Sequence, residues 1–508
     1  MKTAFNRRDF IKLAALASLT PLARALPASA RQNPDQPNVI IILFDALCAL
    51  NLSLHDYARQ TSPQIERFAS RATVYHNHHS AGNYTTPSTA SLFTGSYPWT
   101  HRALNLGSLI SPAVRSQNFF SLLEGTFNQV VFSQNVLADT LLYQFEQHLD
   151  RHLRLDSFSL GGNVFYDNLF SNDAIYGFKS MDQFMFKREE AHGSLFLSLL
   201  NDLSNQYQAR WNAEHYKEQY PNGLPRMANS DVYFMLDQVI DGVAELLGEL
   251  PQPFLTYVHL MPPHQPYIPA QSYLDYFDDG WAPPPKKKHR LAPGNSEERT
   301  QTMRRTYDQF IANLDAEFGR LLDSLESSGL LKNSYVILTS DHGEIFERGA
   351  RGHSMPLVFE PNIRIPLVIS APGQQQRQDI SALTSNVDIL PTLLHIAGLP
   401  RPEWAEGQVL PGLSGVETPD RSIYVVEAKS NPAYSPLTKA TVGLIRGKHK
   451  LVHYLGYKNS RDSYEFYNLE NDPEELTNRY AEHPMAKDLQ AELDQMLAEK
   501  NRPYQGAQ

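Results

Sequence analysis

The chain is poor in cysteine and has no surplus of positive charge. Cys48 is the single cysteine among 508 residues, so no internal disulfide can form and the core must stabilise the fold. Lys and Arg number 45 against 55 Asp and Glu, a formal net charge of −10, so the basic excess typical of nucleic-acid-binding surfaces is absent. With 42% hydrophobic residues the chain can bury a sizeable core, and one large domain with a smaller one is expected.

Long apolar runs are also scarce, and the most conspicuous one lies at the N-terminus. Arg7-Arg8 precede an apolar stretch that ends near Leu22, and sites with the A-x-A pattern of small residues follow at Ala23-Arg24-Ala25 and Ala28-Ser29-Ala30. This run is too short for an ordinary transmembrane helix, whereas a twin-arginine signal peptide has this arrangement. We therefore expect residues 1–30 to be an export signal recognised by the Tat translocase. The mature chain is then predicted to be periplasmic or extracellular, with no integral membrane segment.

The most informative internal segment is TTPSTASLFTG, residues 85–95. Pro87 suits a first helical position and Gly95 suits a helix end, so a short helix over residues 87–94 is predicted. The two preceding threonines then lie at the helix N-terminus, where free N–H groups attract anions. Thr86 is the better candidate for an ordinary N-cap, which leaves Thr85 free for chemistry.

Three apolar runs end in acids or histidines. Residues 39–44 lead into Asp45, residues 334–339 lead into the segment SDHGE, and residues 254–260 lead into MPPHQPY. Continuous apolar runs of this length are typical of buried parallel strands, and open parallel sheets bind ligands at the carboxyl ends of their strands. One Asp after a strand is usually a turn or cap residue, but several together predict a shared site.

The side chains at these strand ends form a set of hard oxygen and imidazole ligands. Asp45, Asp341 and His342 suit a divalent ion such as Zn²⁺ or Mn²⁺, and the Thr85 hydroxyl could supply a further ligand. A threonine hydroxyl is a weak nucleophile at neutral pH, and a divalent cation is one of the few means of activating it. The predicted metal set is therefore Asp45, Thr85, Asp341 and His342.

Together these patterns resemble the sulfatase branch of the alkaline phosphatase superfamily. That branch has a strand ending in a metal-binding Asp, a C-x-P-S-R-x-x-L-x-T-G nucleophile segment, an H-x-P-Y motif and S-D-H-G-E. The matching positions here are Asp45 and residues 85–95, 264–267 and 340–344. Further matches are a helix at 307–325, the segment 387–392 and the segment 465–473. The resemblance covers nearly all of the chain beyond residue 35.

The resemblance implies a fold and a division into domains. The expected fold is an α/β/α sandwich of the alkaline phosphatase/sulfatase type, with a mostly parallel central sheet and a small C-terminal α+β subdomain. Residues 36–398 would form the catalytic domain, with a divergent middle region at 104–250, and residues 399–508 the subdomain. The middle region is rich in aromatic residues, which either line a pocket or, as is more common, belong to the core: Tyr143, Phe145, Phe158, Phe165, Tyr166, Phe170, Tyr176 and Phe178.

Two departures from the family pattern shift the expected chemistry. Sulfatases oxidise a cysteine or serine to formylglycine, and the modification requires the arginine four positions on; the residues here are Thr85 and Thr89. Threonine cannot be converted to that aldehyde. Thr85 instead resembles the nucleophile of phosphoethanolamine transferases, lipoteichoic acid synthases and nucleotide pyrophosphatases, which form a phosphothreonine. Ala46 replaces a second metal-binding Asp of many sulfatases, so one divalent ion is expected, as Zn, Mn, Mg or Ca.

The resemblance also suggests roles for several other side chains. His264, in the H-x-P-Y position, is the first candidate for the acid that protonates the leaving alcohol, and His353 is the second. Four more residues are candidates for binding the substrate: Asn83, His101, His259 and Lys450. The alternatives are a capping or surface role for Asn83 and His101, a core position for His259 and a salt bridge for Lys450.

Three functions remain open from the sequence. The first is an exported metal-dependent phosphodiesterase or phosphotransferase, acting on a small-molecule, lipid or glycan phosphate ester through Thr85. The second is a sulfuric ester hydrolase without formylglycine. The third is a metal- or glycan-binding protein that has lost catalysis. Thr85 weighs against the second, and the joint presence of Asp45, Thr85, His264, Asp341 and His342 weighs against the third.

Overall fold

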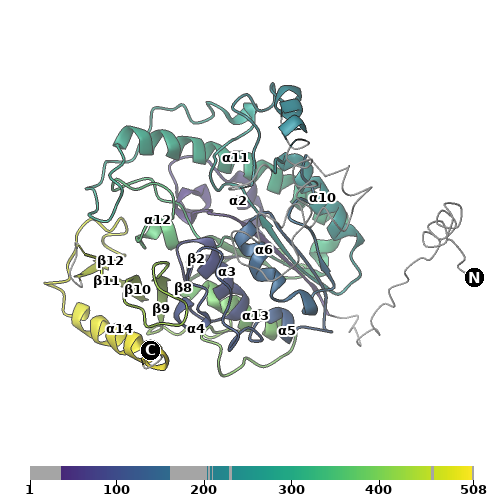
Figure 1. The fold of residues 1–508 in the computed structure, drawn as a ribbon. Coiled ribbons are helices and arrows are strands. Elements are labelled where there is room, and N and C mark those ends of the chain that lie inside the picture. Colours follow the sequence, from purple (N-terminus) through teal and green to yellow (C-terminus); the bar gives the residue numbers. More distant parts are fainter. Residues whose placement is uncertain are drawn as a thin grey trace, which may run out of the picture.

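A computed structural model of the protein describes residues 36–160, 203, 206–208, 210–227, 232–458 and 463–505 (Figure 1). The expected export signal and the aromatic residues between 165 and 178 lie outside these ranges. The centre of the fold is an eight-stranded sheet. Its strands are β1 (Asn38–Phe44), β2 (Thr73–His79), β3 (Asn128–Ser133), β4 (Arg151–His152), β5 (Phe254–Leu260), β6 (Ser334–Thr339), β7 (Leu367–Ser370) and β8 (Gln378–Ser385).

The sheet is mostly parallel, as expected. Its order is β4-β3-β5-β1-β6-β7-β2-β8, and only β7 runs antiparallel to its neighbours. β1 lies between β5 and β6 and pairs with both in parallel register. All seven residues of β1 and of β5 are buried, which is why each appears in the sequence as a continuous apolar run.

Helices cover both faces of the sheet, so the architecture is the predicted α/β/α sandwich (Figure 1). Ile40, Ile42 and Phe44 share one core with α2 (Pro63–Ala69), α10 (Leu236–Glu249) and α11 (Glu297–Ser327). The alternating residues Val39, Ile41 and Leu43 share the other core with α3 (Thr85–Thr94), α5 (Phe119–Leu122), α6 (Val136–Tyr143) and α13 (Ile389–Ile396). Successive side chains of a strand point to opposite faces, so β1 contributes to both cores.

A second, antiparallel sheet follows in the chain. Its four strands have the order β12-β11-β10-β9, and α14 (Met485–Asn501) contributes to the same hydrophobic cluster. The strands are β9 (Ser422–Glu427), β10 (Ala440–Arg446), β11 (His449–Leu455) and β12 (Ser463–Asn468). The remaining helices are short: α4 (Pro98–His101), α12 (Glu360–Ile363) and the 3-10 helices η1 (Ala49–Asn51), η2 (Ser53–His55), η3 (Glu146–His148), η4 (Gln271–Tyr273), η5 (Leu330–Lys332), η6 (Asn386–Asp388) and η7 (Arg502–Tyr504).

The start of α3 differs from the sequence-based expectation. The helix begins at Thr85 rather than at residue 87, and Tyr84 is its N-cap in an extended conformation. The expectation that Thr86 caps the helix is therefore wrong. Its hydroxyl oxygen accepts from the backbone N–H of Gly107 at 3.2 Å, a contact between segments that the local sequence does not reveal.

The middle-region aromatics that the structure describes belong to packed clusters. Phe145 is fully buried beside Phe93 and Phe120, and Phe158 packs edge-on against Phe132. The Tyr143 ring lies 4.6 Å from that of His152. For Phe145 and Phe158 the structure favours the core interpretation over a pocket, whereas Tyr143 is half-buried. Across the described residues, no helix combines the length and the apolar character needed to cross a membrane.

Candidate active site

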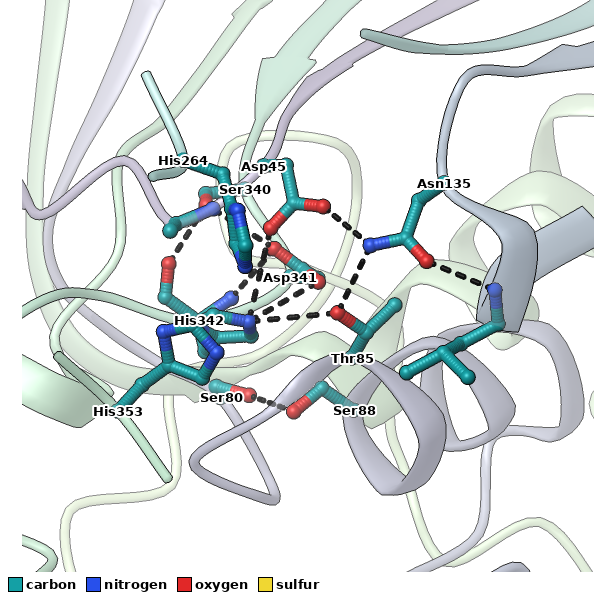
Figure 2. Close-up of polar contacts among 12 residues, drawn as sticks. Asp45, Ser80, Thr85, Ser88, Asn135, His264, Ser340, Asp341, His342 and His353 are labelled. Carbon is teal, nitrogen blue, oxygen red and sulfur yellow. Dashed lines mark hydrogen bonds and ion pairs between the residues drawn. The ribbon is translucent and has the colours of Figure 1, made fainter. Parts of the chain in front are cut away.

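The site lies where β1, β5 and β6 end and α3 begins. Asp45 follows β1, Asp341 and His342 follow β6, and Thr85 is the first residue of α3 (Figure 2). His259 is the penultimate residue of β5 and is also fully buried. The Asp45 backbone N–H donates to the Leu260 carbonyl at 2.9 Å, which fixes the end of β1 beside the end of β5. The structure thus brings the four predicted metal ligands together and adds His259 to them.

The distances within this cluster suit a metal ion better than they suit hydrogen bonds. His342 Nε2 lies 3.4 Å from Asp341 Oδ2, 3.6 Å from Asp45 Oδ1 and 3.4 Å from Thr85 Oγ1. His259 Nε2 lies 3.4 Å from Asp45 Oδ2. Ligand atoms held at about 2.1 Å around a tetrahedral ion are separated by about 3.4 Å. The ligand atoms of Asp45, His259 and Asp341 all fall within 4.8 Å of one another.

Several buried polar atoms in the cluster have no hydrogen-bond partner among the described residues. They are Asp45 Oδ1, Asp341 Oδ2 and His259 Nε2. Buried polar atoms are rarely left unpaired, because each lost hydrogen bond to water costs free energy. Two carboxylate oxygens and an imidazole nitrogen that face one another are the donor set of a divalent cation, so these residues fit the expected metal.

Hydrogen bonds around the cluster orient its ligand atoms. His342 Nδ1 lies 2.9 Å from the Gly343 carbonyl oxygen, so Nδ1 carries the proton and the Nε2 lone pair faces the cluster. Asp341 Oδ1 accepts from the backbone N–H groups of Ala46 and His342, at 3.1 and 2.9 Å, which leaves Oδ2 for the cluster (Figure 2). The protein thus presents the lone pairs that a cation needs.

The charges of the cluster shift its ionisation equilibria. Burial raises the pKa of Asp45, but the neighbouring His264, His259 and His342 outweigh burial and bring this pKa below its usual value. Burial lowers the pKa of His342, and Asp341 opposes that shift only in part. A carboxylate that stays ionised and an imidazole that stays neutral are the forms that bind a metal.

Asn135 is a member of the site that the sequence interpretation missed. Its Nδ2 donates to Asp45 Oδ2 and, at 3.1 Å, to Thr85 Oγ1 (Figure 2). Its Oδ1 accepts from the Leu137 backbone N–H at 2.8 Å and so caps α6. The signal was available, because Asn135 follows the apolar strand β3 as Asp45 follows β1. Asn135 lies inside the divergent middle region, residues 104–250, which the family motifs do not cover.

The rings of the two candidate acids, His264 and His353, lie next to each other beside the cluster in a tilted arrangement. The His353 ring centroid lies 4.2 Å from that of His342 and 4.9 Å from that of His264. His353 Nδ1 is 3.3 Å from both carboxylate oxygens of Glu344, and His264 Nδ1 is 2.6 Å from the Gln265 carbonyl oxygen. Burial lowers the pKa of His353 most, and the charge of His264 lowers it further, to about 3. The His353 imidazole is therefore neutral at pH 7. Burial raises the pKa of Glu344 to about 7.

Asn83 lies near the site but binds protein backbone. Its Nδ2 donates to the carbonyl oxygens of His353, Met355 and Leu357, at 3.3, 2.8 and 3.0 Å. These contacts hold the His353 segment against the chain that precedes α3. Asn83 Oδ1 has no partner among the described residues.

The structure does not bring His101 and Lys450 into the cluster. His101 Nδ1 accepts from the Ala103 backbone N–H at 3.1 Å, so Nε2 carries the proton and lies 2.9 Å from Ser91 Oγ. The buried Lys450 ammonium lies 3.0 Å from Glu360 and 2.8 Å from Glu475, which is the salt-bridge alternative. Both side chains have all their polar atoms occupied by protein partners, because β11 places Lys450 inside the second sheet and α4 turns His101 back onto α3.

Acid is expected to destabilise the protein through His101. Burial lowers the pKa of His101 from 6.5 to about 3, so the unfolded chain binds a proton below pH 6.5 that the folded chain rejects. Stability from this residue is therefore present above pH 6.5 and is lost as the pH falls toward 3. His101→Asn should reduce the slope of unfolding free energy against pH by about 1 kcal/mol per unit between about pH 6 and 4. Urea denaturation across this range measures the slope, and equal slopes would contradict the assignment.

Two protein-family models together match most of the chain. The family model named Sulfatase matches residues 37–137 and 175–399. A second model, N-sulphoglucosamine sulphohydrolase, C-terminal, matches residues 353–503.

Individual relatives and solved structures agree with these matches. The chain is 24% identical over 481 residues to a choline-sulfatase of Rhizobium meliloti, covering 90% of this chain and 85% of the relative. It is 31% identical over 207 residues to arylsulfatase K of Bos taurus, covering 40% of this chain and 37% of that protein. The structure is similar to a phosphonate monoester hydrolase of Agrobacterium radiobacter, with a TM-score of 0.64 and 18% identity over 92% of this chain and 96% of the other. The last similarity supports the fold.

Proposed function

The chain belongs to the sulfatase family, and we propose that it is an exported, metal-dependent member that acts on phosphate esters through a phosphothreonine at Thr85. The observation that carries the proposal is the position of Thr85. Its hydroxyl oxygen lies 3.4 Å from His342 Nε2 and 3.1 Å from Asn135 Nδ2, at the first position of α3. A hydroxyl group therefore stands where the family pattern places the residue that becomes formylglycine, and this position supports Thr85 as the nucleophile.

A divalent ion fits the site, and sulfatase-family enzymes use one. Asp45, Asp341, His342 and Thr85 are the proposed ligands, and His259 is placed to join or replace one of them. When bound, the ion would supply Lewis-acid chemistry that favours the ionised Thr85 hydroxyl. The presence of imidazoles beside carboxylates favours Zn²⁺ or Mn²⁺ over Mg²⁺ or Ca²⁺, which prefer all-oxygen sites.

The first displacement transfers the phosphoryl group to the protein. Thr85 Oγ1 releases its proton to solvent and forms a bond to phosphorus while the bond from phosphorus to the alcohol oxygen breaks. His264, as an imidazolium, gives its proton to the departing alcohol. Backbone N–H groups at the start of α3 and the Asn135 amide stabilise negative charge on the phosphoryl oxygens.

The second displacement restores Thr85. His264, now neutral, takes a proton from water or from an acceptor hydroxyl, whose oxygen attacks phosphorus. The bond between phosphorus and Thr85 Oγ1 breaks, and the Thr85 oxygen takes a proton from solvent, while the proton gained by His264 restores its imidazolium. Water as acceptor makes the protein a hydrolase, and a second alcohol makes it a transferase. Small-molecule, lipid and glycan phosphate esters all suit this chemistry.

Sulfate ester hydrolysis is the second candidate, and the similarity to choline-sulfatase favours it. The residue at position 85 opposes it. Attack by a threonine alkoxide on a sulfate ester would leave a sulfothreonine, and Thr85 lacks the second hydroxyl through which a hydrated formylglycine releases sulfate. Phosphate is released from threonine by a second in-line attack and needs no such aid.

A substrate panel tests the proposal directly. The metal-loaded mature protein is assayed on aryl phosphate monoester, phosphate diester, phosphonate monoester and sulfate ester with one common aryl leaving group. We expect phosphorus esters to be turned over faster than the sulfate ester, and the ratio of monoester to diester rates separates a phosphatase from a diesterase or transferase. A protein that prefers the sulfate ester contradicts the proposal.

Asn135→Ala is expected to lower kcat by about 100-fold, because one hydrogen-bond donor to the reacting oxygens is removed. The same substitution removes the cap of α6, which costs about 1 kcal/mol of stability. Steady-state kinetics and urea denaturation measure the two effects separately.

Asn118→Ala is the matched control, since Asn118 caps α5 by accepting from the Ser121 N–H at 2.9 Å and has no contact with the site. It should lose similar stability while keeping kcat. Equal kcat losses in the two variants would assign the Asn135 effect to folding.

A further inference from the structure

Lys429, in the turn after β9, lies beside the candidate active site. The Val426 backbone N–H donates to the Ala81 carbonyl oxygen at 2.8 Å, so the end of β9 is joined to the segment that leads into α3. Asn105 Nδ2 donates to the carbonyl oxygens of Lys429 and Asn431, the latter at 3.2 Å. The backbone of Lys429 is therefore fixed from both sides, which suits a residue that recognises a ligand.

The Lys429 ammonium lies among residues adjacent to the catalytic ones. It donates to the carbonyl oxygen of Ser354, the residue after His353. It also lies 6.0 Å from the ring centroid of Tyr84, the residue before Thr85. Among the described residues, Lys429 makes no hydrogen bond or ion pair with Thr85 or with the Asp45 cluster. Its contacts are with Ser354 and Tyr84, the sequence neighbours of His353 and Thr85.

This ammonium makes no close ion pair within the part of the chain that the structure describes. Among the described residues, no carboxylate oxygen lies within 4.0 Å of Lys429 Nζ, and a backbone carbonyl is its only hydrogen-bond acceptor. Glu427, on the same turn, attracts the Lys429 charge, but its Oε2 accepts from the Tyr457 hydroxyl at 2.9 Å and its Oε1 accepts from the Lys429 backbone N–H at 3.4 Å. Glu427 therefore makes no close ion pair with Lys429 Nζ. A half-buried cation that makes no close ion pair is stabilised when a ligand brings a negative charge into contact with it.

The loop that binds the Lys429 turn carries exposed apolar side chains. The Gly107 N–H donates to Thr86 Oγ1 at 3.2 Å, and Asn105 binds the Lys429 carbonyl, so the loop 105–109 joins the start of α3 to the Lys429 turn. Leu106 and Leu109 of this loop are 59% and 48% exposed. The loop that holds the Lys429 turn thus supplies exposed apolar side chains, and the turn supplies a positive charge.

We propose that Lys429 is a specificity-determining residue that binds a second anionic group, such as a carboxylate, on the alcohol portion of the ester. This inference rests on the proposed function of Thr85. The phosphoryl oxygens already face Asn135, the start of α3 and the metal ligands, whereas Lys429 lies beyond His353. A substrate that carries an apolar or aryl body between its ester and a second negative charge would satisfy both parts of the site.

The test compares phenyl phosphate with 4-carboxyphenyl phosphate in wild type, Lys429→Met and Lys429→Arg. Lys429→Met keeps the apolar stem and removes the charge. It should raise KM for the carboxylate ester about tenfold, the usual effect of losing one hydrogen bond to a charged group, with kcat unchanged. KM for phenyl phosphate should change less than about twofold, and Lys429→Arg should retain most of the preference. Lys439→Met, an exposed lysine 5.5 Å from the Tyr457 ring centroid, controls for a general change of charge.

Equal changes on both esters, or no change on either, would overturn the role of Lys429. Equilibrium binding of phenylphosphonate and 4-carboxyphenylphosphonate, which contain no ester bond, supplies a readout that needs no turnover. A carboxylate preference in binding that Lys429→Met abolishes, without turnover of either phosphate ester, would support the subsite and contradict the proposed reaction. Thr85-dependent turnover without any carboxylate preference would contradict the subsite alone.

Discussion

Thr85→Ala is expected to lower kcat on phosphate esters by on the order of 10⁵-fold, because the substitution removes the nucleophile of a two-step reaction. Thr85 is 2% exposed, and its hydroxyl contacts only Asn135 Nδ2 at 3.1 Å and His342 Nε2 at 3.4 Å among the described residues, so the loss of the hydroxyl should leave the fold intact. Thr85→Ser keeps a hydroxyl at the start of α3 and should retain measurable turnover. Rates on an aryl phosphate ester, with protein saturated with metal, measure both variants.

Thr94→Ala is the matched control for that experiment. Thr94 is a buried threonine on the same helix, and its hydroxyl donates to the Ala90 carbonyl at 2.7 Å, away from the site. It should keep kcat near the wild-type value. Full activity in Thr85→Ala would show that another group attacks the substrate.

Asp341→Asn is expected to lower metal affinity by at least about 100-fold, since even residues that only support metal ligands have effects of 10- to 100-fold. The asparagine Oδ1 can still accept from the Ala46 and His342 N–H groups. The atom that changes is Oδ2, which faces the cluster without a partner. Activity at fixed metal concentration should fall with occupancy, and excess metal should restore part of it.

Elemental analysis and metal titration of the purified variant measure this effect. Asp379→Asn is the control, because Asp379 is exposed and pairs with Arg377 and His76 at the edge of the sheet. It should bind metal like the wild type. An Asp341→Asn protein with unchanged metal content would remove Asp341 from the ligand set.

The sheet and the main catalytic cluster could be predicted because their signals are local. β1, β5 and β6 are buried on both faces, so each appears as a continuous apolar run whose end is marked by a polar residue. Parallel strands then bring Asp45 and Asp341 to the same end of the sheet, where Asp341 Oδ1 accepts from the backbone N–H of Ala46, 295 positions earlier in the chain. The order of the strands and the pairing of β7 are not encoded in any one segment.

The details that the sequence did not reveal depend on contacts between distant segments. Thr86 was expected to cap α3, but its hydroxyl binds Gly107. Lys450 was a candidate for the substrate because its charge is visible in the sequence, whereas its pairing with Glu360, 90 residues away, is not. His259 was placed between a core and a substrate role, and only the register of β5 beside β1 shows that it faces Asp45.

The stereochemical course at phosphorus tests the central claim most directly. A phosphate ester made chiral at phosphorus by oxygen isotopes or sulfur is turned over by the metal-loaded protein, and the configuration of the product is determined. Two in-line displacements, through Thr85, predict net retention of configuration whether or not the phosphothreonine accumulates. Net inversion would mean that the acceptor attacks the substrate in a single displacement, and it would contradict Thr85 as the covalent nucleophile.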